Sequence, residues 1–183
     1  MTVLHIDSSI TGDNSVSRTL SAAIVERLKR ENGPAPVVRR DLVSEPLDHL
    51  TLDSFADSSI LDEFLSAETI VIGAPMYNFT LPTQLKAWLD RILIAGRTFR
   101  YTAEGPEGLA GGRRVIIALA RGGIYDAGSP SAALEHLESY LRGVFNFIGI
   151  EPEFVAADGL AIGPEQKERA IAAALGETVR LAA

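Results

Sequence analysis

Cysteine is absent from the 183 residues of this sequence. A chain without thiols forms no disulfides, no thiolate zinc or iron–sulfur sites, and has no cysteine nucleophile. Histidine is scarce, because only His5, His49 and His136 are present and they lie far apart in the chain. Scattered histidines do not form a dedicated metal site, so we expect no bound metal.

Long apolar runs and an excess of basic charge are also missing. No run approaches the roughly 18 residues that a membrane span needs, and residues 1–7 lack the basic start and apolar stretch of a secretory signal. The 17 Lys and Arg against 24 Asp and Glu give a net charge of −7, which argues against nucleic acid or an anionic membrane as a partner. We therefore expect a cytoplasmic protein, and the length favours a single domain over residues 1–183.

Short apolar runs alternate with longer amphipathic segments along the chain. The runs predict strands over 3–6, 37–42, 69–74, 115–120 and 153–157. The helical spacing of apolar residues predicts helices over 17–29, 54–66, 81–94, 131–147 and 164–181. Arg39 and Arg40 interrupt the second strand, which favours an edge position for it. Gly and Pro residues in 96–112, around Phe99 to Tyr101, indicate a short hairpin outside this alternation.

Five strands that alternate with helices predict an α/β fold. The expected architecture is a three-layer sandwich, with a five-stranded parallel sheet of order 2-1-3-4-5 and helices on both faces. Ligands of such sheets bind at the carboxyl ends of the strands. Three loops meet there: loop 1 (residues 7–18), loop 2 (residues 74–79) and loop 3 (residues 120–125).

Loop 1 is rich in hydroxyls and leads directly into a helix. Ser9, Ser15 and Ser17 offer hydroxyl donors, and the helix N-terminus attracts anions. The sequence has neither the GxxxxGK[ST] loop of nucleoside-triphosphate sites nor a GxGxxG dinucleotide fingerprint. A phosphate held without a lysine suits a mononucleotide such as FMN. The alternative is a solvated loop with a serine cap.

Loops 2 and 3 have the character of walls around a flat ligand. Met76, Tyr77 and Phe79 are large apolar side chains directly after a buried strand, where loops usually carry polar residues. The alternative for them is a local apolar core under the next helix. Gly122 and Gly123 permit close backbone approach, or form a plain turn. Arg121 either offsets negative charge on a reduced ring or makes a surface ion pair.

Two long segments carry a family resemblance. Residues 74–90 (APMYNFTLPTQLKAWLD) and 96–109 (GRTFRYTAEGPEGL) resemble the FMN-dependent NADH azoreductases, also described as NADH:quinone oxidoreductases. The segments HIDSS (5–9), RGGI (121–124) and FIG (147–149) extend the resemblance over nearly the whole chain. It implies a flavodoxin-like fold, tight non-covalent FMN, NADH or NADPH as electron donor, and quinone or azo substrates. It also implies a homodimer with shared active sites, and chemistry done by FMN with no catalytic side chain.

The resemblance also assigns site residues. Phosphate contacts fall on Ser9, Ser15, Val16 and Ser17. Contacts to the ring fall on Pro75, Met76, Tyr77, Asn78 and Phe79 on one side and on Ala120, Arg121, Gly122 and Gly123 on the other. Tyr101 and Phe147 resemble family positions that reach the partner's active site and shape its substrate pocket, and Tyr125 is a further pocket residue. Ala120 replaces a frequent hydroxyl residue of the family, Tyr125 stands where a histidine is familiar, and the stretch from 37 to 66 is shorter than is common.

Two other functions fit the same sheet. A flavodoxin-type electron carrier binds FMN without turning over an organic substrate. A phospho-receiver domain needs a phospho-acceptor aspartate after the third strand and a lysine after the fifth, whereas Pro75 and Asp158 stand there. His5 is expected to be a packed, hydrogen-bonded strand residue, Asp7 a partner of loop 1, and Trp88 a core residue.

Overall fold

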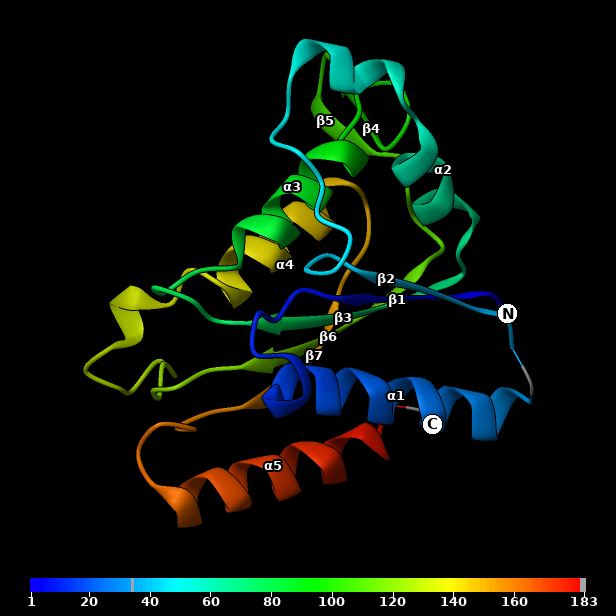
Figure 1. Ribbon diagram of the computed structural model, residues 1–183. Helices are drawn as coiled ribbons and strands as arrows, with labels where there is room; N and C mark the ends of the chain where they lie inside the picture. Colours follow the sequence, from blue (N-terminus) through cyan, green and yellow to red (C-terminus); the bar gives the residue numbers. More distant parts are fainter. Residues whose placement is uncertain (34, 182–183) are drawn as a thin grey trace.

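A five-stranded parallel sheet forms the centre of the structure, a computed structural model that describes residues 1–33 and 35–181 (Figure 1). Its strands follow the order β2-β1-β3-β6-β7. Their bounds are β1 Val3–Asp7, β2 Val37–Asp41, β3 Thr69–Pro75, β6 Arg114–Ala120 and β7 Glu153–Ala157. Counted within the sheet alone, this is the order 2-1-3-4-5, because β4 and β5 form a separate two-stranded sheet. The arginine-containing β2 is at the edge, as its sequence indicates.

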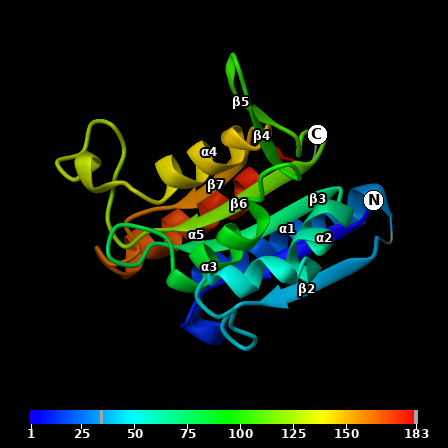
Figure 2. The same cartoon turned by 90° about the horizontal axis from the view of Figure 1, so that it is seen from above.

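Helices cover both faces of the sheet. In Figures 1 and 2, α1 and α5 lie on one face, and α2, α3 and α4 lie on the other. Side chains alternate between the two faces, so that Ile70 and Ile72 pack in one apolar cluster and Val71 in the other. The helices are α1 Val16–Asn32, α2 Ser59–Ser66, α3 Thr83–Ile92, α4 Glu138–Phe147 and α5 Pro164–Thr178. Among the residues described, no helix has the length and apolar character to cross a membrane.

The first helix is held close to the sheet at its N-terminal end. Ser15 is its N-cap, and the Ser15 hydroxyl accepts a hydrogen bond from the backbone N–H of Arg18 at 3.2 Å. A Cβ on Gly73 of β3 would lie 3.1 Å from the backbone oxygen of Ser17, so the absent side chain permits this approach. The helix ends at Gly33, which has a φ of 79°. The sequence Asn32-Gly33-Pro34 predicts the end of this helix, and Pro34 lies outside the described residues.

Two predicted helices are each divided into a 3₁₀ turn and a shorter α-helix. Residues 54–66 divide into a 3₁₀ turn η2 (Leu52–Ala56) and α2, and Phe55, counted in the apolar stripe, is exposed. Residues 131–147 likewise divide into η3 (Ala132–Leu134) and α4. The break there has a local cause, since the carboxylate of Glu135 accepts hydrogen bonds from three backbone N–H groups at the start of α4, at 2.8–3.0 Å.

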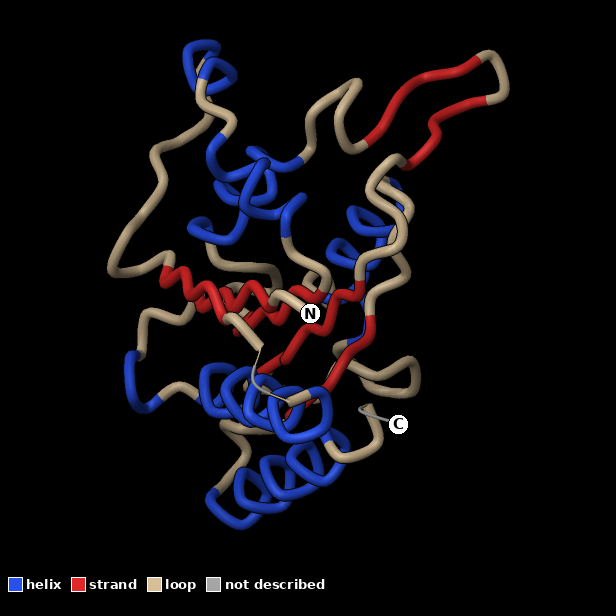
Figure 3. The backbone as a smooth tube through the Cα atoms, turned by 90° about the vertical axis from the view of Figure 1, so that its right-hand side faces the viewer, coloured by secondary structure: helices blue, strands red, loops and turns tan. Residues whose placement is uncertain are grey.

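The predicted hairpin projects from the body of the molecule. Strands β4 (Phe99–Thr102) and β5 (Gly105–Gly108) pair antiparallel and stand clear of the main sheet (Figure 3). Its base is fastened to the end of α4, because the rings of Phe99 and Phe147 have centroids 4.7 Å apart. A Cβ on Gly108 would lie 2.2 Å from the backbone nitrogen of Gly149, so this crossing requires glycine.

Candidate functional site

The serine side chains of loop 1 are buried and hydrogen-bonded rather than exposed to solvent. Ser9, Ser15 and Ser17 are at most 4% exposed. The hydroxyl oxygens of Ser15 and Ser17 lie 3.1 Å apart, and that of Ser9 lies 3.0 Å from Thr11 Oγ1 and 3.2 Å from the phenolic oxygen of Tyr77. Two hydroxyls bonded to each other use one of their two protons, and three hydroxyls with two contacts use two of three. Each cluster therefore keeps one O–H with which to donate.

The start of α1 adds backbone donors beside these hydroxyls. The first N–H groups of a helix have no acceptor within the helix, and α1 begins at Val16, between Ser15 and Ser17. A 17-residue helix also places the positive end of its dipole here. The donor set is thus hydroxyls plus amides around one point, which suits a phosphate monoester.

Loop 2 makes a tight turn with two left-handed residues. Tyr77 and Thr80 exchange backbone hydrogen bonds of 2.9 and 3.1 Å, and the two residues between them, Asn78 and Phe79, have φ values of 47° and 73°. Two positive φ values are the pattern of a type I′ turn, which favours Asn or Gly. Asn78 fits this requirement, whereas Phe79 is strained there and its ring is nonetheless 44% exposed. Strained, exposed aromatic residues are characteristic of binding sites.

Loop 3 presents backbone donors on the side of β3. The carbonyls of Arg121, Gly122 and Gly123 accept hydrogen bonds of 2.9–3.1 Å from the backbone of residues 159–161, which follow β7. In a trans peptide the carbonyl and the next N–H point in opposite directions. The N–H groups of Gly122 and Gly123 therefore point away from β7, toward the β3 side where loop 2 lies.

The Arg121 guanidinium is turned away from this donor edge into an ion cluster. It is 6% exposed and bonds the two carboxylate oxygens of Asp158 at 2.6 and 2.8 Å, with Glu138 and Glu135 at 3.3 and 3.5 Å. Burial alone would lower the pKa of Arg121, but these carboxylates raise it above its usual value. The ion-pair interpretation is right about the pairing, although the pair is buried rather than on the surface.

Hydrogen bonds join the three loops into one unit. The phenol of Tyr77 bonds loop 2 to loop 1, and the backbone N–H of Met76 donates to the carbonyl of Ala120 in loop 3 at 2.9 Å. The carbonyl of Phe79 accepts from the N–H of His136 at 3.1 Å, which fixes the turn of loop 2 to the segment before α4. A hollow of about 590 Å³ lies here, lined by Ile10, by residues 76–78 and by the start of α3.

The predicted pocket residues fall in two places: Tyr101 and Phe147 both pack against Phe99, with ring centroids 5.7 and 4.7 Å away, whereas Tyr125 lies at loop 3. Tyr125 packs its ring against Gly123, where a Cβ would lie 3.2 Å from two of the ring carbons. Phe147 ends α4, about 13 Å along the helix axis from Glu138, which lies beside loop 3. Tyr101 lies on the projecting hairpin and is 76% exposed (Figures 1 and 3).

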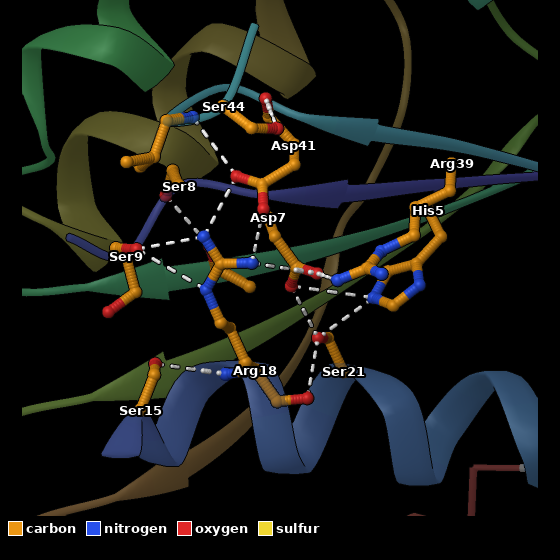
Figure 4. Close-up of polar contacts among 12 residues, drawn as sticks. His5, Asp7, Ser8, Ser9, Ser15, Arg18, Ser21, Arg39, Asp41 and Ser44 are labelled. Carbon is orange, nitrogen blue, oxygen red and sulfur yellow. Dashed lines mark hydrogen bonds and ion pairs between the residues drawn. The ribbon is translucent and has the colours of Figure 1, made fainter. Parts of the chain in front are cut away.

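Sequence reasoning missed a polar cluster behind loop 1 (Figure 4). Arg18 of α1 lies near Asp7 at the end of β1 and bonds to Asp41 at the end of β2. The sequence predicts both strands but not that this arginine connects their ends. His5 is packed and hydrogen-bonded as predicted, with its Nε2 2.9 Å from Ser21 Oγ. Burial would raise the pKa of Asp7, but His5, Ser21 and Arg39 hold it below its usual value.

A family model described as the flavodoxin-like fold matches residues 1–181. The FMN-dependent NADH:quinone oxidoreductase 2 of Bradyrhizobium diazoefficiens is 53% identical over all of both chains. That alignment spans 201 positions, and 201 − 183 = 18, so the relative has residues that this chain lacks. An enzyme of the same name from Rhizobium meliloti is 49% identical over 95% of this chain and 93% of its own.

Solved structures give the same result in three dimensions. An azoreductase from Bacillus anthracis superposes with a TM-score of 0.90 at 29% identity, covering 100% of this chain and 98% of its own. An FMN-dependent NADH-azoreductase of that species, solved in complex with FMN, has a TM-score of 0.85 at 28% identity and covers all of both chains.

Proposed function

This chain belongs to the flavodoxin-like family, together with the FMN-dependent NADH:quinone oxidoreductases that share about half of its residues, and we propose that it is itself such an enzyme. Its substrates are quinones and aromatic azo compounds, reduced by two electrons from NADH or NADPH. The proposal depends on one observation: the three loops form a single bonded unit at the carboxyl edge of the sheet, in a chain aligned with those enzymes from end to end.

The donor chemistry of the loops fits FMN. The spare hydroxyls of loop 1 and the amides at Val16 and Ser17 would hold the phosphate. The turn at Asn78 and Phe79 would contact the ring. The backbone N–H groups of Gly122 and Gly123 would donate to the polar edge of the ring. When bound, FMN supplies the redox chemistry by accepting a hydride and passing two electrons on, so no side-chain nucleophile is needed.

The protein then contributes position and exclusion of water. NADH and the electron acceptor would bind one after the other at the same exposed side of the bound flavin ring, which is a ping-pong order. Stacking each reactant in register provides effective molarity, worth on the order of 7–11 kcal/mol in well-oriented systems. The backbone N–H groups of Gly122 and Gly123, whose peptides are held by residues 159–161, would stabilise negative charge on bound FMN without reorganisation.

A second copy of the chain completes the pocket in this proposal. Tyr101 projects away from its own loops, and an apolar groove of about 440 Å³ lies on α4, lined by Leu93, Tyr140, Val144 and Phe147 among others. A homodimer would cover this groove and bring the hairpin to the partner's site. Sedimentation equilibrium of the holoprotein should give about twice the 19.6 kDa chain mass, and a monomer would contradict the shared site. A single domain and a cytoplasmic location, where NADH is available, belong to the same proposal.

Absorption and turnover test the function. The purified protein, or apoprotein given FMN, should show a flavin spectrum and oxidise NADH in the presence of menadione or methyl red. Double-reciprocal plots should be parallel. A yellow protein with neither turnover would instead be an electron carrier, and a protein that binds no FMN would contradict the proposal entirely.

A further inference from the structure

Arg18 commits its guanidinium to two partners behind loop 1. Its Nε and Nη2 donate to the carbonyl of Ser9 at 3.3 and 2.9 Å, and its two terminal nitrogens donate to the carboxylate oxygens of Asp41 at 2.7 and 2.8 Å (Figure 4). Nη1 also lies 3.6 Å from the carboxylate of Asp7. The side chain is 14% exposed. The guanidinium therefore has no donor directed into the site.

The carboxylate that holds Arg18 is itself fixed. Asp41 ends β2, and its Oδ1 accepts the N–H of Val43 at 3.0 Å while the Ser44 hydroxyl donates to its backbone carbonyl at 3.2 Å. A bidentate arginine–carboxylate pair sets direction as well as distance. Arg18 thus fixes the position of the Ser9 backbone relative to the edge strand β2.

Both ends of loop 1 depend on this one residue. The carbonyl of Ser9, at the start of the loop, is held by the Arg18 side chain, and the hydroxyl of Ser15, at its end, caps the Arg18 backbone N–H. Ser9 and Ser15 also belong to the two hydroxyl clusters with a spare proton. A displacement of Arg18 would misdirect both clusters.

The charge of Arg18 is neutralised inside the cluster. Asp41 balances Arg18, and Arg39 Nη2 lies 3.2 Å from Asp7 and balances that carboxylate. The two cations and two anions of this cluster compensate one another, so the charge of Arg18 is already paired within it. Arg18 therefore acts through geometry rather than by attracting an anion from a distance.

We propose that Arg18 and Asp41 are positioning residues for the phosphate of FMN: they hold Ser9 and Ser15 in the arrangement that receives it, without touching it. This inference rests on the proposed FMN function. It concerns only the phosphate end of the cofactor, so it predicts a difference between FMN and riboflavin, which has the same ring and no phosphate.

The test compares the two flavins on apoprotein. Fluorescence titration gives the dissociation constants of FMN and riboflavin for the wild type, Arg18→Met and Asp41→Asn. In both variants FMN should bind about tenfold more weakly, the effect of one or two misplaced hydrogen bonds, while riboflavin affinity stays as in the wild type. Arg18→Lys keeps the charge but loses the bidentate fork, so it should behave like Arg18→Met.

A matched pair on the other side of the same strand provides the control. Arg40 donates to Glu63 at 2.7 and 3.2 Å, also bidentate and similarly buried, but it joins β2 to α2. Arg40→Met should lower stability and leave the FMN-to-riboflavin ratio unchanged. The double variant Arg18→Met/Asp41→Asn leaves no unpaired charge and allows measurement if a single variant folds poorly.

Each result leads to a separate conclusion. If the wild type binds FMN and the variants lose FMN and riboflavin affinity equally, or lose neither, the positioning role is wrong while the proposed function stands. If Arg18→Lys restores FMN affinity, the residue acts through charge, and the inference is also wrong. If the wild type binds neither flavin, the proposed function fails first.

Discussion

The phenolic oxygen of Tyr77 lies 3.2 Å from the hydroxyl oxygen of Ser9 and 3.1 Å from the backbone nitrogen of Ile10, so a single side chain from the loop after β3 bonds to the loop after β1. The two loops follow the neighbouring strands β1 and β3, and the Tyr77 side chain connects them beyond the end of the strand pairing. The phenol therefore adds a side-chain link between the two loops, beside the bond from the Ser8 hydroxyl to the carbonyl of Gly73 in β3.

Removing this oxygen should loosen the site. Tyr77→Phe leaves the ring in place and deprives Ile10 and Ser9 of a partner, so we expect FMN to bind about fivefold more weakly, corresponding to ~1 kcal/mol. Flavin fluorescence during titration of the apoprotein measures this. Tyr101→Phe removes the same atom from the exposed hairpin and serves as control; an equal loss in both variants would contradict the bridging role.

Phe79 should show opposite effects on stability and on binding. Its φ of 73° costs a phenylalanine roughly 1 kcal/mol, and asparagine tolerates this conformation better. Phe79→Asn should therefore raise the free energy of unfolding of the apoprotein by up to about 1 kcal/mol in urea, while FMN affinity falls because an apolar wall is lost. Phe55→Asn changes an exposed phenylalanine without positive φ and should not stabilise. A destabilised Phe79→Asn apoprotein would show that the turn is not strained.

The sequence predicts the layers of this fold well because most strands of the central sheet are continuous apolar runs, as residues 69–72 illustrate. It overestimates two helices because apolar spacing does not reveal where a helix begins. The three N–H bonds to Glu135 decide the start of α4, and they depend on a side chain turning back on its own chain. The exposed Phe55 likewise counts toward a stripe that it does not join.

The site is predictable in part for a similar reason. The hydroxyls of loop 1 and the glycines of loop 3 are visible as composition at strand ends. Arg18 of α1 and Asp41 of β2 are 23 residues apart and meet because α1 packs against β1, which pairs with β2. The burial of Arg121 depends on Asp158, which follows another strand. Such contacts follow from tertiary structure and not from local pattern.

The contribution of the Arg18–Asp41 ion pair to the free energy of unfolding should depend on pH. Hydrogen bonds from Arg18 lower the pKa of Asp41 from 3.8 to about 2. A carboxyl with a lowered folded-state pKa stabilises the protein above its unfolded pKa, and this contribution is lost as the pH falls from about 4 to about 2. We expect it to be at most ~2 kcal/mol, reduced by screening because the side chain is 23% exposed.

Urea unfolding of the apoprotein at pH 7 and pH 3 measures this contribution. Asp41→Asn has no carboxylate to protonate at this position, so its stability should fall less between pH 7 and pH 3 than that of the wild type. Asp53→Asn is the control, since it removes an exposed carboxylate that lies in η2, away from the Arg18–Asp41 pair. An identical acid response of wild type and Asp41→Asn would show that the pair does not contribute.

Arg121 should be the most costly of these residues to replace. Arg121→Met leaves Asp158 and Glu135 without a counter-charge and leaves Glu138 with only the exposed Arg142, and removal of one partner from a buried ion cluster costs about 3–5 kcal/mol. The change should also reverse the pH dependence. In the wild type, burial would raise the pKa of Glu135, but hydrogen bonds from backbone N–H groups outweigh it and hold the pKa below its usual value, so stability decreases on acidification.

In the variant the crowded carboxylates bind protons more readily in the folded state than in the unfolded chain. Their folded pKa values then lie above the unfolded ones, and stability increases as the pH falls through them. Urea unfolding at pH 7.5 and pH 5 should therefore show Arg121→Met gaining stability at the lower pH while the wild type does not. Arg142→Met removes an exposed arginine that contacts Glu138 in the same cluster at 2.8 Å, and should cost less than ~1 kcal/mol. A small, pH-independent loss in Arg121→Met would mean that water, and not the guanidinium, compensates these carboxylates.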